Sequence, residues 1–163
     1  MNLVHLAVLV YAAAIICANL LAAHYGPSIT PYVALTLVGI DLSVRDWLQV
    51  QISRRQMAML IPIAGMMAYL LNPAVRPIAI ASTVAFIVSE WAEWGTFTLT
   101  SGSWFSRSVK SNTVAAAVDS LIFPALAFHA WLPWIVLAQF LAKTMGSTVW
   151  AYCLQFVPMR RRS

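Results

Sequence analysis

Residues 3–23 read LVHLAVLVYAAAIICANLLAA, a continuous apolar run near the start of the chain. The run contains no Asp, Glu, Lys or Arg. As a helix it is long enough to cross the hydrocarbon core of a bilayer, which takes about 20 residues. No Lys or Arg precedes it, so we expect a retained membrane span and not a cleaved signal peptide.

The composition of the whole chain supports the same class. Of 163 residues, 61% are hydrophobic and 9% are charged, whereas soluble domains carry about 25% charged residues. A water-soluble fold of this size could not bury that much apolar surface. We therefore predict an all-α integral membrane protein, with residues 1–163 forming a single transmembrane domain.

Five further apolar segments follow the first. Together they predict a compact bundle of six transmembrane helices. The expected spans are residues 3–23, 29–44, 57–71, 76–94 with an extension toward 99, 112–128 and 131–157. Two turn signals separate them most clearly, Gly26-Pro27 and Asn72-Pro73.

Basic residues are distributed unevenly between the two sides of these spans. If the N-terminus lies inside, only Arg76 falls on the outer side. The eight basic residues expected on the cytoplasmic side are Arg45, Arg54, Arg55, Arg107, Lys110, Arg160, Arg161 and Arg162. This bias predicts that the N-terminus and the C-terminus are both cytoplasmic. The net charge of +5 therefore indicates topology and does not predict a nucleic-acid partner.

Several charged residues interrupt the apolar segments. A charge near the centre of a bilayer costs about 2.5–3.5 kcal/mol on insertion scales. Such residues usually line a cavity, pair with one another or contact a polar solute. They are Asp41, Glu90, Glu93, Asp119 and Lys143, whereas Asp46 lies in a more polar segment.

Two close spacings predict shared helix faces. Asp41 and Arg45 are four residues apart, which allows an ion pair on one face. A local anchor at the membrane interface is the alternative. Glu90 and Glu93 are three residues apart and face the same side, where they repel unless a cation, a proton or a donor-rich solute lies between them. The alternative is that both acids are solvated where their helix leaves the membrane.

Asp119 and Lys143 lie deeper in their spans than the other charges do. We expect them to pair with each other, or with Asp41 or Glu90, and a purely structural pair remains an alternative. Carboxylates, an amine and several aromatic rings suit a planar, donor-rich heterocycle. The sequence shows no group of oxygen ligands that would converge on a metal ion, and it contains no catalytic motif. We therefore predict no metal, no cofactor and no enzymatic activity.

Three alanines of the first span, Ala14, Ala18 and Ala22, recur at four-residue spacing. Small residues at this spacing let helices approach closely. They predict packing within the bundle or, as an alternative, a docking face for another subunit.

The order of several motifs resembles a known family. Asp41-Leu42-Ser43-Val44-Arg45 is followed by Ser53-Arg54-Arg55, and later by Val118-Asp119-Ser120 with Phe123. This order is similar to that of the bacterial queuosine-precursor transporters, the putative vitamin uptake transporter family. The positions that match the family pattern, and that the resemblance implies as substrate-binding, are Asn19, Asp41, Arg45, Ser82, Glu90, Glu93, Ser111, Asp119 and Lys143.

The resemblance also implies a function and partners. It implies a multi-pass protein of the bacterial inner membrane that imports 7-cyano-7-deazaguanine, 7-aminomethyl-7-deazaguanine or both for queuosine synthesis in tRNA. The expected partners are this deazapurine base and membrane lipid, with a homo-oligomer left open. The alternative is a substrate-binding membrane subunit of an energy-coupling-factor vitamin importer, which alone would bring an ATPase module as a partner.

Overall fold

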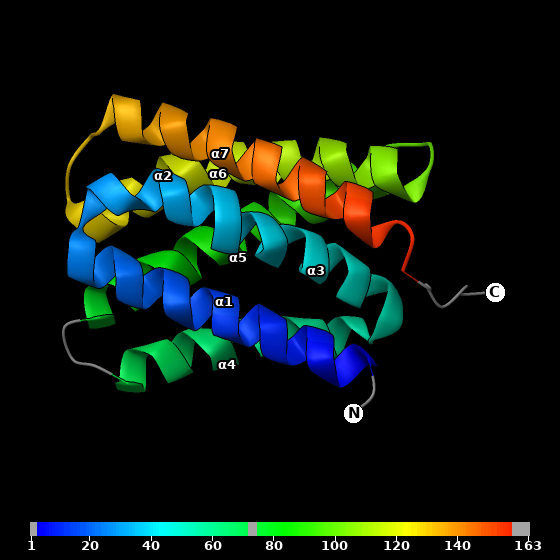
Figure 1. The fold of residues 1–163 in the computed structure, drawn as a ribbon, viewed down its shortest axis with the longest axis horizontal. Coiled ribbons are helices and arrows are strands. Elements are labelled where there is room, and N and C mark those ends of the chain that lie inside the picture. The colour runs from blue at the N-terminus through cyan, green and yellow to red at the C-terminus, as the bar shows by residue number, and fades with distance from the viewer. Residues whose placement is uncertain (1–2, 72–74, 158–163) are drawn as a thin grey trace.

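The computed structural model describes residues 3–71 and 75–157, and every regular element in them is helical. Five long α-helices run side by side along the length of the molecule (Figure 1). They are α1 (Leu3–Tyr25), α4 (Arg54–Leu71), α5 (Arg76–Leu99), α6 (Trp104–Phe128) and α7 (Pro133–Leu154).

A composite helix connects α1 to α4. It is built from η1 (Pro27–Ile29), α2 (Thr30–Val33), η2 (Ala34–Val38) and α3 (Gly39–Gln51). The η2 segment is a π-helical turn, in which the chain is wound more widely than in an α-helix. Such turns occur mostly inside α-helices and frequently at functional sites.

Three stretches of helix in the described part of the chain are long and apolar enough to cross a membrane. They are Leu3–Tyr25, Pro27–Leu48 and Trp104–Phe128. The prediction of an all-helical membrane protein agrees with this finding.

Two helices extend beyond the predicted spans. The helix expected to end at residue 44 continues to Gln51, and α4 starts afresh at a capping box between Ser53 and Gln56. The helix expected to begin at residue 112 begins at Trp104, because the Ser103 side chain accepts a hydrogen bond from the Ser106 backbone N–H.

These extensions correct two predictions about basic loops. Arg45 belongs to a helix and is completely buried, so it is not a residue of a cytoplasmic loop. Arg107 and Lys110 lie in the first two turns of α6. The predicted turn at Asn72-Pro73 lies outside the described residues, as does the basic run of residues 160–162.

The backbones of α7 and the composite helix are in direct contact at two glycines. A Cβ atom built on Gly39 would lie 2.8 Å from the Gly146 Cα, and one built on Gly146 would overlap the Leu35 carbonyl oxygen. The Ser43 hydroxyl also donates a 2.8 Å hydrogen bond to the Ser147 carbonyl. The two backbones therefore touch directly, with glycine on both sides.

The ends of the helices are grouped in a regular way (Figure 1). The first turn of α1 and the last turn of α7 lie at the same end of the bundle, together with the α3–α4 and α5–α6 connections. The α1–η1 turn lies at the opposite end, with the α6–α7 connection, where His129 ends α6 in the left-handed conformation with φ of 49°.

Candidate functional site

A polar cavity lies inside the bundle, between α1, the composite helix, α5, α6 and α7. It contains about 60 Å³ in which the centre of a water molecule fits, several times the space that one water needs. Its polar lining residues are Asn19, Thr30, Asp41, Ser82, Asp119, Gln139 and Lys143. The cavity is therefore large enough and polar enough to hold a small polar solute.

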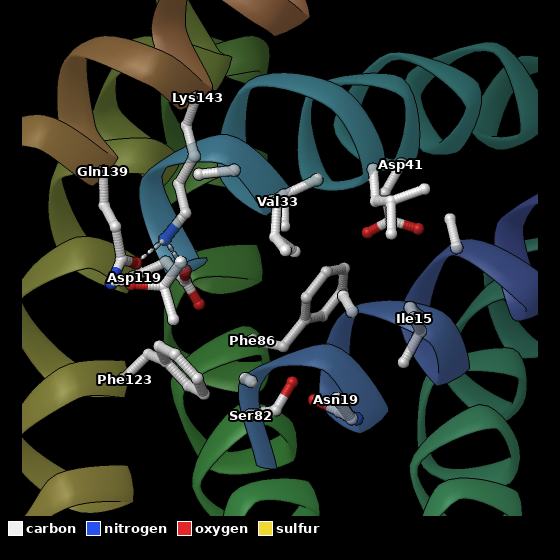
Figure 2. Close-up of a pocket in the computed structure, with 17 residues that line it drawn as sticks. Ile15, Asn19, Val33, Asp41, Ser82, Phe86, Asp119, Phe123, Gln139 and Lys143 are labelled. Carbon is white, nitrogen blue, oxygen red and sulfur yellow. Dashed lines mark hydrogen bonds and ion pairs between the residues drawn. The ribbon is translucent and has the colours of Figure 1, made fainter. Parts of the chain in front are cut away.

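Lys143 organises a network of polar side chains at one wall of the cavity (Figure 2). Its ammonium Nζ lies 2.5 Å from Asp119 Oδ2. It also donates to Gln139 Oε1 at 2.9 Å and to Ser120 Oγ at 3.2 Å. The Gln139 side-chain amide in turn donates to Thr30 Oγ1 at 2.8 Å. The predicted pair of Asp119 and Lys143 is thus present, within a hydrogen-bonded network.

Asp41 and Asn19 contribute polar atoms that the protein itself leaves unbonded. Both side chains line the cavity and are at least 97% buried. Asp41 Oδ1 and Asn19 Nδ2 have no hydrogen-bond partner among the described residues. Buried polar groups are usually satisfied, and each unpaired one carries a desolvation cost of about 1–3 kcal/mol. A carboxylate acceptor and an amide donor are therefore available to a solute in the cavity.

The remaining walls are apolar and partly aromatic. Phe86 and Phe123 line the cavity from α5 and α6, and residues of η2 line it from the composite helix. Ala14, Ala18 and Ala22 line it from α1. The alanine spacing thus serves contacts within the bundle, and the alternative of an outward docking face is not supported.

A second polar cluster surrounds Arg45. Its guanidinium is fully buried and lies 2.5 Å from a carboxylate oxygen of Glu90, 3.6 Å from one of Asp46 and 3.9 Å from one of Glu93. Arg45 Nη2 also donates to the Asn112 side-chain oxygen at 3.2 Å. One guanidinium is therefore shared among three carboxylates.

Asp46 is the residue of this cluster whose burial was not predicted. It is 2% exposed, and its Oδ2 accepts a 2.8 Å hydrogen bond from the Asn112 amide and another from the Ser108 hydroxyl. The expectation that Asp46 lies in a polar segment is wrong, because α3 continues past residue 44 and carries Asp46 into the bundle.

Phe86 borders both polar clusters. Its ring lines the cavity and also lies with its centroid 5.5 Å from the Arg45 guanidinium carbon. On its other flank, the ring makes an edge contact with buried Tyr11 at 6.3 Å between centroids. This side chain therefore separates the cavity from the Arg45 cluster.

The predicted site residues consequently fall into three groups. Five line the cavity: Asn19, Asp41, Ser82, Asp119 and Lys143. Three form the Arg45 cluster: Arg45, Glu90 and Glu93. Ser111 belongs to neither, because its hydroxyl is bonded to the Ser108 carbonyl of its own helix.

One predicted pairing does not occur, and one alternative pairing is not realised. No contact between Asp41 and Arg45 occurs among the ion pairs of the described residues, because Arg45 turns toward α5 and α6. Glu90, which was one alternative partner for Asp119 and Lys143, does not join that pair, because Arg45 binds its carboxylate.

Sequence reasoning did not identify Thr30, Gln139 or Asn112 as site residues. Gln139 carried a usable signal, since it precedes Lys143 by four residues and so shares its helix face. Thr30 and Asn112 acquire their roles only through helices distant in the sequence.

The fold and the cavity together describe a helical protein with apolar, membrane-length helices and an internal polar cavity. The comparison with protein families agrees with this class. The chain belongs to the putative vitamin uptake transporter family, whose description matches residues 5–157. This is a family of transporters and not of enzymes. No curated protein and no solved structure matches the chain significantly.

Proposed function

We propose that this protein is an inner-membrane transporter that imports a queuosine precursor, 7-cyano-7-deazaguanine, 7-aminomethyl-7-deazaguanine or both, for the modification of tRNA. The observation that carries the proposal is the internal cavity. It combines a buried acid–amine pair, an unbonded carboxylate oxygen, an unbonded amide donor and two aromatic side chains.

This set of groups suits a deazapurine base. The ring N–H and amino groups of a guanine-like edge are donors, which carboxylates accept, while its carbonyl accepts from an amide such as that of Asn19. Phe86 and Phe123 offer apolar faces for the ring. We assign substrate contacts to Asn19, Asp41, Ser82 and Asp119, with Lys143 holding Asp119 and Gln139 in place.

The proposal includes a topology. Six membrane crossings in one transporter domain, with both termini in the cytoplasm, would place the ends of α1 and α7 on one side. Their common location in the bundle supports this arrangement. Arg55, Arg107 and Lys110 lie toward that same end, as the positive-inside rule requires of a cytoplasmic side. Arg76 begins α5 at the opposite end.

Uptake in cells tests the proposal. A bacterial strain that lacks synthesis of the base and its own carrier is supplied with either base at low external concentration, and queuosine in its tRNA is measured. Expression of this protein is expected to restore queuosine. The exposed Lys110→Gln variant is the matched control and should restore it equally. Absence of queuosine with the protein in the membrane would refute the substrate assignment.

The energy-coupling-factor alternative has no specific support from the site. Such subunits are also small six-helix proteins, and they dock through small-residue faces, whereas the alanines of α1 line the cavity. Uptake that requires an added ATPase module would restore this alternative.

A further inference from the structure

The charges that line the cavity do not balance. Among the described residues, the ionisable side chains at its wall are two carboxylates, Asp41 and Asp119, and one ammonium, Lys143. Asp119 is compensated by Lys143 at 2.5 Å. With both acids ionised, the lining therefore carries one net negative charge, and that charge belongs to Asp41.

Lys143 cannot compensate Asp41 as well. An ammonium group has three donors, and those of Lys143 are directed to Asp119 Oδ2, Gln139 Oε1 and Ser120 Oγ at 2.5, 2.9 and 3.2 Å. Figure 2 shows Asp41 on the opposite side of the cavity from Lys143. The ammonium is thus both saturated and turned away from Asp41.

Arg45, one helical turn beyond Asp41, is also committed elsewhere. Its guanidinium lies 2.5 Å from Glu90 and within 3.9 Å of Asp46 and Glu93. Three carboxylates already share its single positive charge. Asp41 is 3% exposed, and its Oδ1 has no hydrogen-bond partner among the described residues.

We infer that Asp41 selects a cationic ligand: a flat heterocycle that bears a primary ammonium group. A buried carboxylate is costly unless a cation pairs with it, and such a ligand brings that cation into the cavity. This inference rests on the proposed function and sharpens it. Of the two precursor bases, the aminomethyl form carries an amine that is protonated at neutral pH, as lysine is, whereas the cyano form is uncharged at that position.

The orientation of the ligand follows from the two sides of the cavity. The ammonium lies at Asp41, and the ring extends past Phe86 toward Asp119. The guanine-like edge of the ring then meets the Asp119–Lys143–Gln139 network, which is the same for both bases. Asp41 is therefore the protein residue that discriminates between the two bases.

Binding of the two bases to the purified protein tests the inference. Affinities of wild type, Asp41→Asn and Asp41→Glu are measured at pH 7 by calorimetry in detergent, with 7-aminomethyl- and 7-cyano-7-deazaguanine as probes. Wild type is expected to bind the aminomethyl base about 10- to 100-fold more tightly, the range that a charge-assisted hydrogen bond supplies. Asp41→Asn should remove this preference, because it should weaken binding of the aminomethyl base about 10- to 100-fold more than binding of the cyano base, and Asp41→Glu should keep the preference.

Each other outcome has a distinct meaning. Equal affinities of wild type for the two bases would overturn the inference, and this comparison requires no variant to fold. Equal weakening of both bases by Asp41→Asn would also overturn it, because Asp41 would then not discriminate between them. If wild type binds neither base, the proposed function fails, whereas a preference for the cyano base contradicts only the role of Asp41.

Discussion

The acid–amine pair at the cavity allows a quantitative prediction. Lys143→Met removes an ammonium that is 2% exposed and has three acceptors, and it leaves Asp119 without its counter-charge. Removing one partner of a buried pair costs about 3–5 kcal/mol. The Asp119 side chain is 17% exposed, so water relieves part of this cost. We expect a loss of about 3 kcal/mol in the free energy of unfolding.

Thermal unfolding in detergent measures this loss. For a chain of this length, 1 kcal/mol corresponds to about 2–4 °C, so Lys143→Met should lower Tm by about 6–12 °C. The same substitution at exposed Lys110 is the matched control and should change stability by less than about 0.5 kcal/mol.

The double variant Lys143→Met with Asp119→Asn separates charge from packing. It should recover most of the lost Tm, since no unpaired carboxylate remains, while uptake stays impaired because the charged acceptor for the base is gone and an amide NH2 donor stands in its place. A Tm for Lys143→Met equal to that of Lys110→Met would refute the reasoning, because the pair would then contribute nothing to the fold.

Three further predictions concern other parts of the molecule. Gly146→Ala should lower the free energy of unfolding by about 1–3 kcal/mol, because its Cβ would overlap the Leu35 carbonyl. Gly95→Ala is the control, because a Cβ there meets nothing within 4 Å, and it should be neutral or stabilising by up to about 1 kcal/mol. Arg45→Met should lower the free energy of unfolding by about 3–5 kcal/mol, because it removes the buried positive charge that three carboxylates share, and an unchanged Tm would contradict the Arg45 cluster as described. Asn19→Ala should reduce uptake by about tenfold or more without lowering Tm, since its Nδ2 has no protein partner to lose; normal uptake would exclude Asn19 from the site.

Hydropathy alone placed the helices correctly but not their ends. The additional turns of α6 begin at the Ser103 cap, and the capping box of Ser53 with Gln56 starts α4 directly after α3; both signals are present in the sequence. The predicted spans end earlier because residues 45–56 and 100–111 are polar, and the prediction treats this polarity as the end of a span. A helix in a bundle tolerates polar residues wherever other helices satisfy them, so a polar stretch does not by itself end a span.

The sequence could predict those site residues that lie far from the ends of their apolar spans. Asp119 and Lys143 were expected to pair with each other, or with Asp41 or Glu90, because both lie deep in their spans, and the first of these pairings is present. The partners of Arg45 were not predictable, because Asp46 is adjacent in sequence while Glu90 and Asn112 come from two other helices. Arg45 pairs with groups of α5 and α6, and not with Asp41 of its own helix, because of how the helices pack in three dimensions.

Transport by the purified protein tests the central claim most directly. Wild type is reconstituted in liposomes, and the uptake of radiolabelled 7-aminomethyl-7-deazaguanine is compared with that of liposomes containing the stable Asp119→Asn, Lys143→Met double variant. The account predicts saturable uptake by wild type, competition by unlabelled base and little uptake by the double variant. Uptake by wild type no faster than that of protein-free liposomes, or equal uptake by the double variant, would contradict a deazapurine transporter that works through this cavity.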